Sequence, residues 1–77
     1  MADSTFPLTM ASHGEVVKIV AIRAGWGLTR RLADMGVLPG TTVKVVRGHM
    51  PGPVVVEVKG SRLALGHGMA HKIMVET

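Results

Sequence analysis

The stretch Leu28-Thr-Arg-Arg-Leu-Ala-Asp-Met-Gly-Val-Leu-Pro-Gly40 decides the fold of this chain. Leu28, Leu32 and Met35 recur at i, i+4 and i+7, which predicts a short helix with a narrow apolar stripe. Gly36 follows where a helix commonly ends in a residue of positive φ. A helix of about two turns is unstable alone in water, so it must pack against the rest of the chain.

The residues on either side of that stretch give the helix its boundaries and its continuation. Gly27 is an acceptable N-cap, although no Ser/Thr-x-x-Glu capping box accompanies it. Val37 is the apolar residue expected to fold back over the last turn, and residues 38–40 predict a turn. The β-branched segment Thr41–Arg47 then predicts a strand. The helix is therefore expected to lie as a lid on a sheet.

Short runs of valine, isoleucine and leucine predict that sheet. They are separated by a loop at His49–Pro53, a tight turn at Lys59–Gly60 and a single helical turn at Gly66–His71. The predicted strands are Glu15–Ile22, Thr41–Arg47, Val54–Val58, Ser61–Leu65 and Ile73–Glu76. From the alternation of apolar and polar residues, the side chains expected to point inward are those of Val54, Val56, Val58, Leu63, Leu65, Ile73 and Val75.

These elements predict a mainly β fold, a small barrel of about five strands with one short helix after the first main strand. With 77 residues, the chain is expected to form a single domain over 1–77. Residues 1–13 are expected to be a loose N-terminal lead-in. Phe6, Leu8 and Met10 alternate, however, so part of this segment could pair as a short edge strand.

The composition narrows the classes of function. Hydrophobic residues make up 47% and aromatic residues 3% of the chain, which has no cysteine. A disulfide framework, a cysteine–zinc site and thiol catalysis are therefore excluded. No apolar run approaches the roughly 20 residues of a transmembrane helix, and the first residues do not resemble a signal peptide. These features favour a cytoplasmic protein that does not insert into the membrane.

Enzymatic, nucleic-acid and proline-peptide functions find little support. The carboxylates are spread along the sequence without a close pair for acid–base chemistry, and no phosphate-binding loop is present. The net charge is +4, but the basic residues are scattered and stacking aromatics are missing, which disfavours nucleic acid as a partner. An aromatic-lined peptide groove cannot be built without tyrosine. The chain is therefore predicted not to be an enzyme and to use no cofactor.

The motifs together resemble a known family. The chain resembles the ferrous-iron-transport protein A (FeoA) family over about residues 14 to 76. The segments that carry the resemblance are, in order, Arg31–Gly40, Val43–Arg47, Pro53–Leu65, and Ala70 with Ile73–Glu76. The resemblance implies an SH3-like β-barrel. It also implies a small cytoplasmic accessory of FeoB, the membrane transporter with a GTPase domain that carries Fe²⁺.

The histidines raise the question of a metal site. His67 and His71 are spaced i, i+4 and would share one face of a helical turn. Fe²⁺ or Zn²⁺ would need a third ligand, and His49 or Glu76 could be recruited only by the fold. The preferred interpretation is two solvent-exposed histidines and no metal site, with His67 and His71 as minor candidates. The resemblance supplies no metal motif at these positions.

The region around the predicted helix offers a candidate partner-binding surface formed by Trp26, Arg30 and Arg31. Trp26 stands between two glycines before the predicted helix, and tryptophan is favoured at the centre of interfaces. Arg30 and Arg31 would lie in the first turns and Asp34 near the end, against the helix dipole. An ordinary solvated face is the alternative, and an arginine finger for the transporter GTPase is a less favoured variant of the docking hypothesis.

The sequence is therefore compatible with two functions. The first is an accessory protein that docks on the FeoB-type transporter and modulates ferrous iron uptake. The second is a metal-responsive regulatory module, because the same type of domain resembles the C-terminal SH3-like domain of diphtheria-toxin-repressor-type regulators. The absence of a DNA-binding helix-turn-helix from the sequence favours the first. The sequence is also compatible with a weak homo-oligomer.

Overall fold

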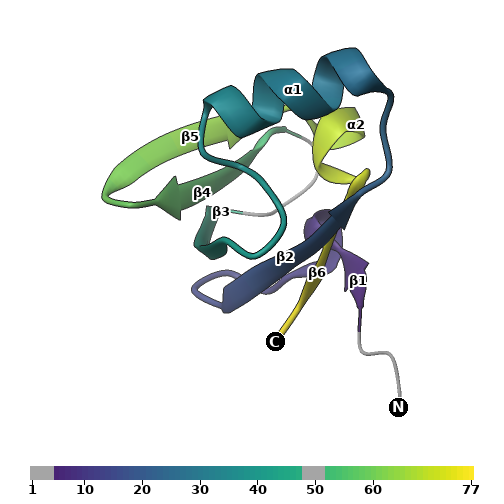
Figure 1. The fold of residues 1–77 in the computed structure, drawn as a ribbon. Coiled ribbons are helices and arrows are strands. Elements are labelled where there is room, and N and C mark those ends of the chain that lie inside the picture. Colours follow the sequence, from purple (N-terminus) through teal and green to yellow (C-terminus); the bar gives the residue numbers. More distant parts are fainter. Residues whose placement is uncertain (1–4, 48–51) are drawn as a thin grey trace.

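The computed structural model describes residues 5–47 and 52–77. Strands dominate these residues, and the helices are short (Figure 1). The predicted loop residues His49 to Pro51 lie outside the described ranges. In chain order the elements are β1 (Phe6–Pro7), the 3₁₀ helix η1 (Leu8–Met10), β2 (Val16–Ile22), α1 (Trp26–Asp34), β3 (Thr42–Arg47), β4 (Val54–Val58), β5 (Ser61–Leu65), α2 (His67–Ala70) and β6 (Ile73–Glu76).

All strands belong to one antiparallel sheet in the order β1-β6-β2-β3-β4-β5. The predicted mainly β fold with one helix after the first main strand is therefore confirmed. Within residues 5–47 and 52–77 the sheet has six strands rather than about five, and it does not close, because β1 and β5 remain edges. Register shifts at Val20 and Val46 mark irregularities of the kind that bend a sheet. The bent sheet wraps around its own core (Figure 1).

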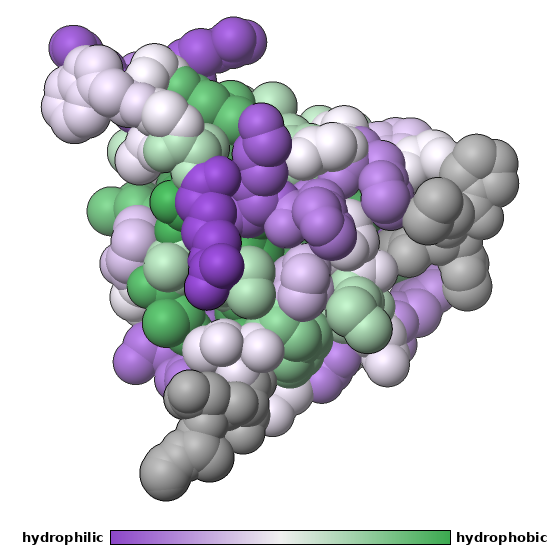
Figure 2. All heavy atoms as spheres, turned by 90° about the vertical axis from the view of Figure 1, so that its right-hand side faces the viewer, coloured by the Kyte–Doolittle hydropathy of each residue, from purple (hydrophilic) through white to green (hydrophobic). Residues whose placement is uncertain are grey.

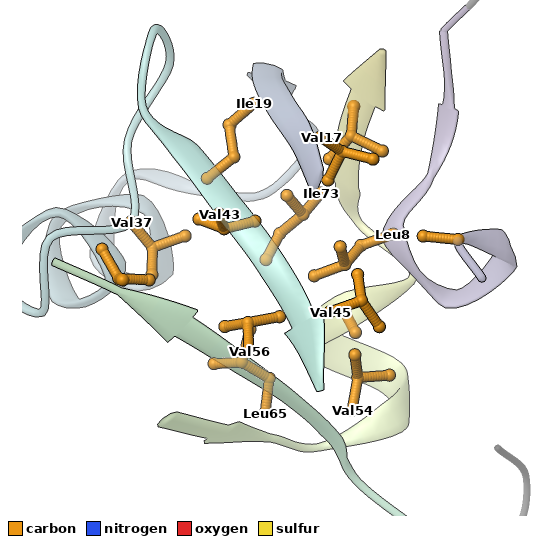
Figure 3. Close-up of a cluster of buried hydrophobic side chains, with 14 of the residues drawn as sticks. Leu8, Val17, Ile19, Val37, Val43, Val45, Val54, Val56, Leu65 and Ile73 are labelled. Atoms are coloured by element: carbon orange, nitrogen blue, oxygen red, sulfur yellow. The ribbon is translucent and has the colours of Figure 1, made fainter. Parts of the chain in front are cut away.

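The core consists almost entirely of aliphatic side chains that converge from both halves of the bent sheet (Figure 3). The predicted alternation in β4 is confirmed, since Val54, Val56 and Val58 are all buried. Leu65, Ile73 and Val75 are buried as predicted, and Leu63 is half-buried against the same cluster. A small domain with few aromatic residues thus obtains its stability by packing valine, leucine and isoleucine at high density.

The N-terminal segment is more ordered than a loose lead-in. Phe6 and Pro7 pair with Val75 and Met74 of β6, which confirms the edge strand that the alternation allowed. Leu8 in η1 is 1% exposed and belongs to the core. The expectation of a loose segment is therefore wrong for residues 6–11, because their apolar side chains complete the core beside β6.

Helix α1 begins two residues earlier than its pattern suggested. The N-cap is Gly25, in an extended conformation, and not Gly27, which lies inside the helix. The C-terminal end agrees with the sequence prediction, since Gly36 has φ of +88°. The amide of Gly36 donates a hydrogen bond to the carbonyl oxygen of Ala33 at 2.9 Å. The amide of Val37 donates one to the carbonyl oxygen of Leu32 at 2.8 Å. This paired arrangement is a Schellman motif.

The predicted apolar stripe of α1 is only partly buried. Leu32 is 0% exposed and Leu28 is half-buried against the core, as expected. Met35 is 43% exposed, so its assignment to the core is wrong. The reason is geometric: Met35 is the C-cap, with φ of −92° and ψ of 4°, and the backbone there no longer follows the helical rotation. The side chain of Met35 therefore does not take the core-facing position that the i+7 residue of an ideal helix would have.

Candidate docking surface

Helix α1 is held so that its outer side faces solvent. Leu28 and Leu32 point to the core, and the Oγ1 of Thr29 donates to the carbonyl oxygen of Ala24 at 3.3 Å. At the other end, Gly36 lies against β4, where a Cβ on this glycine would be 3.6 Å from Cγ1 of Val58. Both ends of the helix are thus tied to neighbouring backbone or core. The side chains on the side of α1 that faces away from the core project into solvent.

Trp26 and Arg30 project from the same side of α1. Trp26 is the first residue of α1 and is 76% exposed, and Arg30 is exposed one turn later. Residues four apart in a helix are neighbours on its surface. The structure therefore brings together an exposed indole and an exposed guanidinium, although Trp26 lies in the helix and not before it. An aromatic face beside a cation can bind a partner that is both apolar and acidic.

Arg31 belongs to a different flank of α1. It is exposed, but it is rotated by about 100° from Arg30 around the helix axis. The three predicted residues therefore form a band around the exposed side of the helix, with Trp26 and Arg30 on one flank and Arg31 on the other.

The helix-dipole argument for this surface is wrong. Because α1 begins at Trp26, Arg31 lies in the last turn and Arg30 lies in the middle of the helix. A cation in the last turn is favoured by the dipole. The features of this surface that favour docking are therefore the exposure and the chemistry of its side chains. Over the face in Figure 2, apolar and polar residues interleave, so the exposed apolar residues there form no single continuous patch.

The two candidate metal ligands lie at the two ends of the predicted helical turn, His67 as the first residue of α2 and His71 as its C-cap. The amide of His71 donates to the carbonyl of His67 at 3.0 Å, so the two residues stack one turn apart. His67 is half-buried and His71 is exposed. Within residues 5–47 and 52–77, no three histidine, cysteine, aspartate or glutamate residues gather as metal ligands, and Glu76 is not brought into such a group. His49 lies outside the described residues.

One feature of the surface escaped the sequence analysis. An open hollow of about 430 Å³ is lined by His13, Val46, Arg47, Val55 and Arg62. Its wall comes from β3, β4, β5 and the turn before β2, so it depends on strand register and on the irregularity at Val46. No local pattern in the sequence predicts this hollow, because its lining residues come together only when the strands pair. Among the residues that the structure describes, its lining carries arginines and no carboxylate, which suits an anionic group better than acid–base catalysis.

Among the residues that the structure describes, no helix has the length and apolar character required to cross a membrane.

Comparisons with known proteins identify the relatives of this chain. The family model described as the FeoA domain matches residues 6–77. A protein of Methanocaldococcus jannaschii described as a putative Fe(2+) transport protein A is 46% identical over 71 residues, which cover 92% of this chain and 85% of that protein.

Solved structures agree with this assignment. The crystal structure of an iron uptake regulatory protein (FeoA) is 35% identical, covers 94% of this chain and 96% of its own, and has a TM-score of 0.87. A FeoA protein from Chlorobium tepidum is 27% identical, with 92% of this chain and 69% of its own covered, at a TM-score of 0.82. A manganese-dependent transcriptional repressor, 19% identical, matches all of this chain with 44% of its own, at a TM-score of 0.88. These matches confirm the SH3-like fold class.

Proposed function

The chain belongs to the FeoA domain family, and on that premise we propose that it is an accessory protein of ferrous iron uptake that docks on a FeoB-type membrane transporter. Docking takes place at the cytoplasmic side of the transporter and modulates its activity. The contact surface is the band formed by Trp26, Arg30 and Arg31 on the exposed side of α1. The role is non-catalytic and needs no cofactor.

The family membership is the observation that carries this proposal. The 46% identical relative is described as an iron transport protein, and the 35% identical structure is described as an iron uptake regulatory protein. The shape of the molecule supports an accessory role, because one helix with an exposed outer side lies on a small sheet. A standard protein–protein contact buries roughly 800 Å² on each partner. The exposed side of α1 with its flanking residues can contribute the centre of such a contact.

The chemistry of the surface defines the site expected on the transporter. The Trp26 indole is 76% exposed and can bury a large apolar area with little loss of side-chain entropy. Arg30 and Arg31 require acidic residues around the site that receives the indole. Binding should therefore weaken as salt is raised, because exposed ion pairs are screened over about 10 Å at 0.1 M ionic strength.

The test is a comparison of two double variants. Arg30→Ala with Arg31→Ala removes both cations from α1, whereas Lys18→Ala with Lys44→Ala removes two exposed cations from the sheet. Both variants have the same net charge, so nonspecific electrostatic attraction changes equally. Calorimetry or pull-down with the transporter's cytoplasmic domain should show loss of binding for the first and retention for the second. Equal binding of both at low salt would identify the α1 surface as a solvated face.

The metal-responsive regulatory module is a weaker candidate. The likeness to the manganese-dependent repressor, at 19% identity, concerns the fold alone. His67 and His71 offer two ligands, and transition-metal sites usually require three or more from the protein. Titration with Fe²⁺ and Mn²⁺, followed by calorimetry, separates the two functions. Stoichiometric micromolar binding that is abolished by His67→Ala with His71→Ala would favour the regulatory module over the docking protein.

A further inference from the structure

The two edges of the sheet differ in their capacity to accept another strand. At one edge, β1 has only two residues, one of which is Pro7. Short strands and proline are common means of protecting an edge from further pairing. At the other edge, β5 has five residues and pairs with β4 alone within the described parts of the chain. The β5 edge is therefore the one that is open to strand addition.

The turn between β4 and β5 determines which backbone groups face that open edge. Lys59 and Gly60 have φ of +50° and +85°, which is the signature of a two-residue type I′ hairpin. The flanking residues Val58 and Ser61 then form a hydrogen-bonded pair. Because hydrogen-bonded and non-bonded pairs alternate, the N–H and C=O groups of Arg62 and Ala64 point away from β4.

The outer face of the sheet carries a row of alternating charge that ends at this edge. Lys44 of β3 is in register with Glu57 of β4, and Glu57 is in register with Arg62 of β5. Directly opposite residues of opposite charge stabilise each other across an antiparallel pair. Along the described strands, Arg62 has a carboxylate neighbour in this row on one side only. The next position of the row would be on a strand added beyond β5.

We propose that an extended acidic segment of a partner protein adds to the sheet as a strand beside β5. Its backbone pairs with the N–H and C=O groups of Arg62 and Ala64, and an aspartate or glutamate lies opposite Arg62. This mode of recognition takes affinity from the main chain and specificity from alternate side chains. The inference concerns a surface separate from the α1 band and does not depend on it.

The surroundings of Arg62 favour an acidic segment over a second copy of this chain. Arg62 lines the hollow together with Arg47, so acidic side chains on the outer face of the added strand meet two guanidinium groups. The sequence of β5, Ser-Arg-Leu-Ala-Leu, contains no carboxylate that could continue the row in a symmetric dimer. On the inner face, half-buried Leu63 is available to an apolar residue. The expected segment therefore alternates acidic and apolar residues.

The first experiment uses a peptide of about eight residues that alternates glutamate and valine, since strands of this length are usual in sheets. A matched peptide with lysine in place of glutamate is the control. In NMR titrations of the whole chain, the glutamate peptide should shift the amide signals of Arg62 and Ala64 and slow their hydrogen exchange. Equal effects of both peptides, or shifts confined to α1, would overturn the proposal.

Two matched variants locate the charge contact. Arg62→Ala and Lys44→Ala each remove one cation beside Glu57, but only Arg62 lies at the open edge. Arg62→Ala should weaken binding of the glutamate peptide by about two- to fivefold, the size of a cross-strand charge pair, and Lys44→Ala should leave it unchanged. If both variants weakened peptide binding equally, general positive charge would be attracting the peptide. That result would refute the proposed register, in which an acidic residue of the added strand lies opposite Arg62.

A third variant tests the backbone contact. Ala64→Pro removes an N–H that points away from β4, so the hairpin retains its own hydrogen bonds while the edge loses a donor. The variant should remain folded in thermal melts and lose the slowed exchange at Arg62. Undiminished peptide binding by folded Ala64→Pro would overturn strand addition, and if that variant unfolds, the comparison of Arg62→Ala with Lys44→Ala decides. Self-association of the unmodified chain that competes with the peptide would assign the edge to a second copy instead.

Discussion

The amide of Val37 donates a hydrogen bond to the carbonyl of Leu32 across 2.8 Å, and both side chains are buried. Through this bond the end of α1 folds back onto its own last turn. The chain then enters the turn that leads to β3, where the amide of Gly40 donates to the carbonyl of Ile19 in β2 at 2.8 Å. The turn that follows α1 is thus joined to β2 by a backbone hydrogen bond, while Leu32 and Val37 hold the end of the helix in the core.

Leu32 should be essential for stability, and Met35 should not. Leu32 is 0% exposed, so Leu32→Ala should destabilise the protein by about 2–5 kcal/mol. Met35→Ala, at a position that is 43% exposed, should cost well under that amount. Thermal or urea unfolding of the two variants provides the measurement. Similar losses for both would mean that the C-cap methionine packs against the core in solution.

Gly36→Ala should be destabilising because of the backbone conformation at that position. With φ of +88°, an added Cβ would be strained by about 1 kcal/mol or more. Gly27→Ala is the matched control, since Gly27 lies inside α1 and a Cβ added there would meet no atom of another element within 4 Å. That change should stabilise the helix by roughly 0.5–1 kcal/mol. Opposite signs in denaturant unfolding are expected, and a loss for both would contradict the assigned helix boundaries.

The N-terminal segment should contribute to the core. Leu8 is 1% exposed, whereas Met10, two residues later, is 71% exposed. Leu8→Ala should therefore lower the free energy of unfolding by about 2–5 kcal/mol, and Met10→Ala should have little effect. Equilibrium unfolding compares the two directly. A neutral Leu8→Ala would show that the segment is dispensable.

Trp26 provides a spectroscopic test of the α1 surface, because it is the only tryptophan in the chain. Its fluorescence emission should be that of a water-exposed indole. Iodide, an anion, should quench this emission more strongly in the unmodified protein than in the Arg30→Ala variant, in which the neighbouring cation is absent. Acrylamide, which is neutral, should quench both proteins equally. A blue-shifted emission that resists both quenchers would contradict the exposed position of the indole.

The strands of this fold could be predicted from the sequence because they are short runs rich in valine, isoleucine and leucine, and in β4 every second side chain is buried. The start of α1 could not, since Gly25 and Gly27 flank Trp26 symmetrically and neither offers a capping side chain. The burial of Leu8 depends on β6, which lies at the far end of the sequence. The candidate residues Trp26, Arg30 and Arg31 could be selected by type, but their separation onto two flanks required the true helix start.

The pairing of Phe6 with Val75 also has a consequence for synthesis on the ribosome. This contact joins residues from nearly opposite ends of the chain, and contacts of such long sequence separation slow folding. Leu8 and Ile73 cannot share a core until the last strand has left the exit tunnel. The hairpin of β4 and β5, whose residues are close in sequence, can form earlier. The nascent chain is therefore expected to complete this fold only after β6 has emerged from the ribosome.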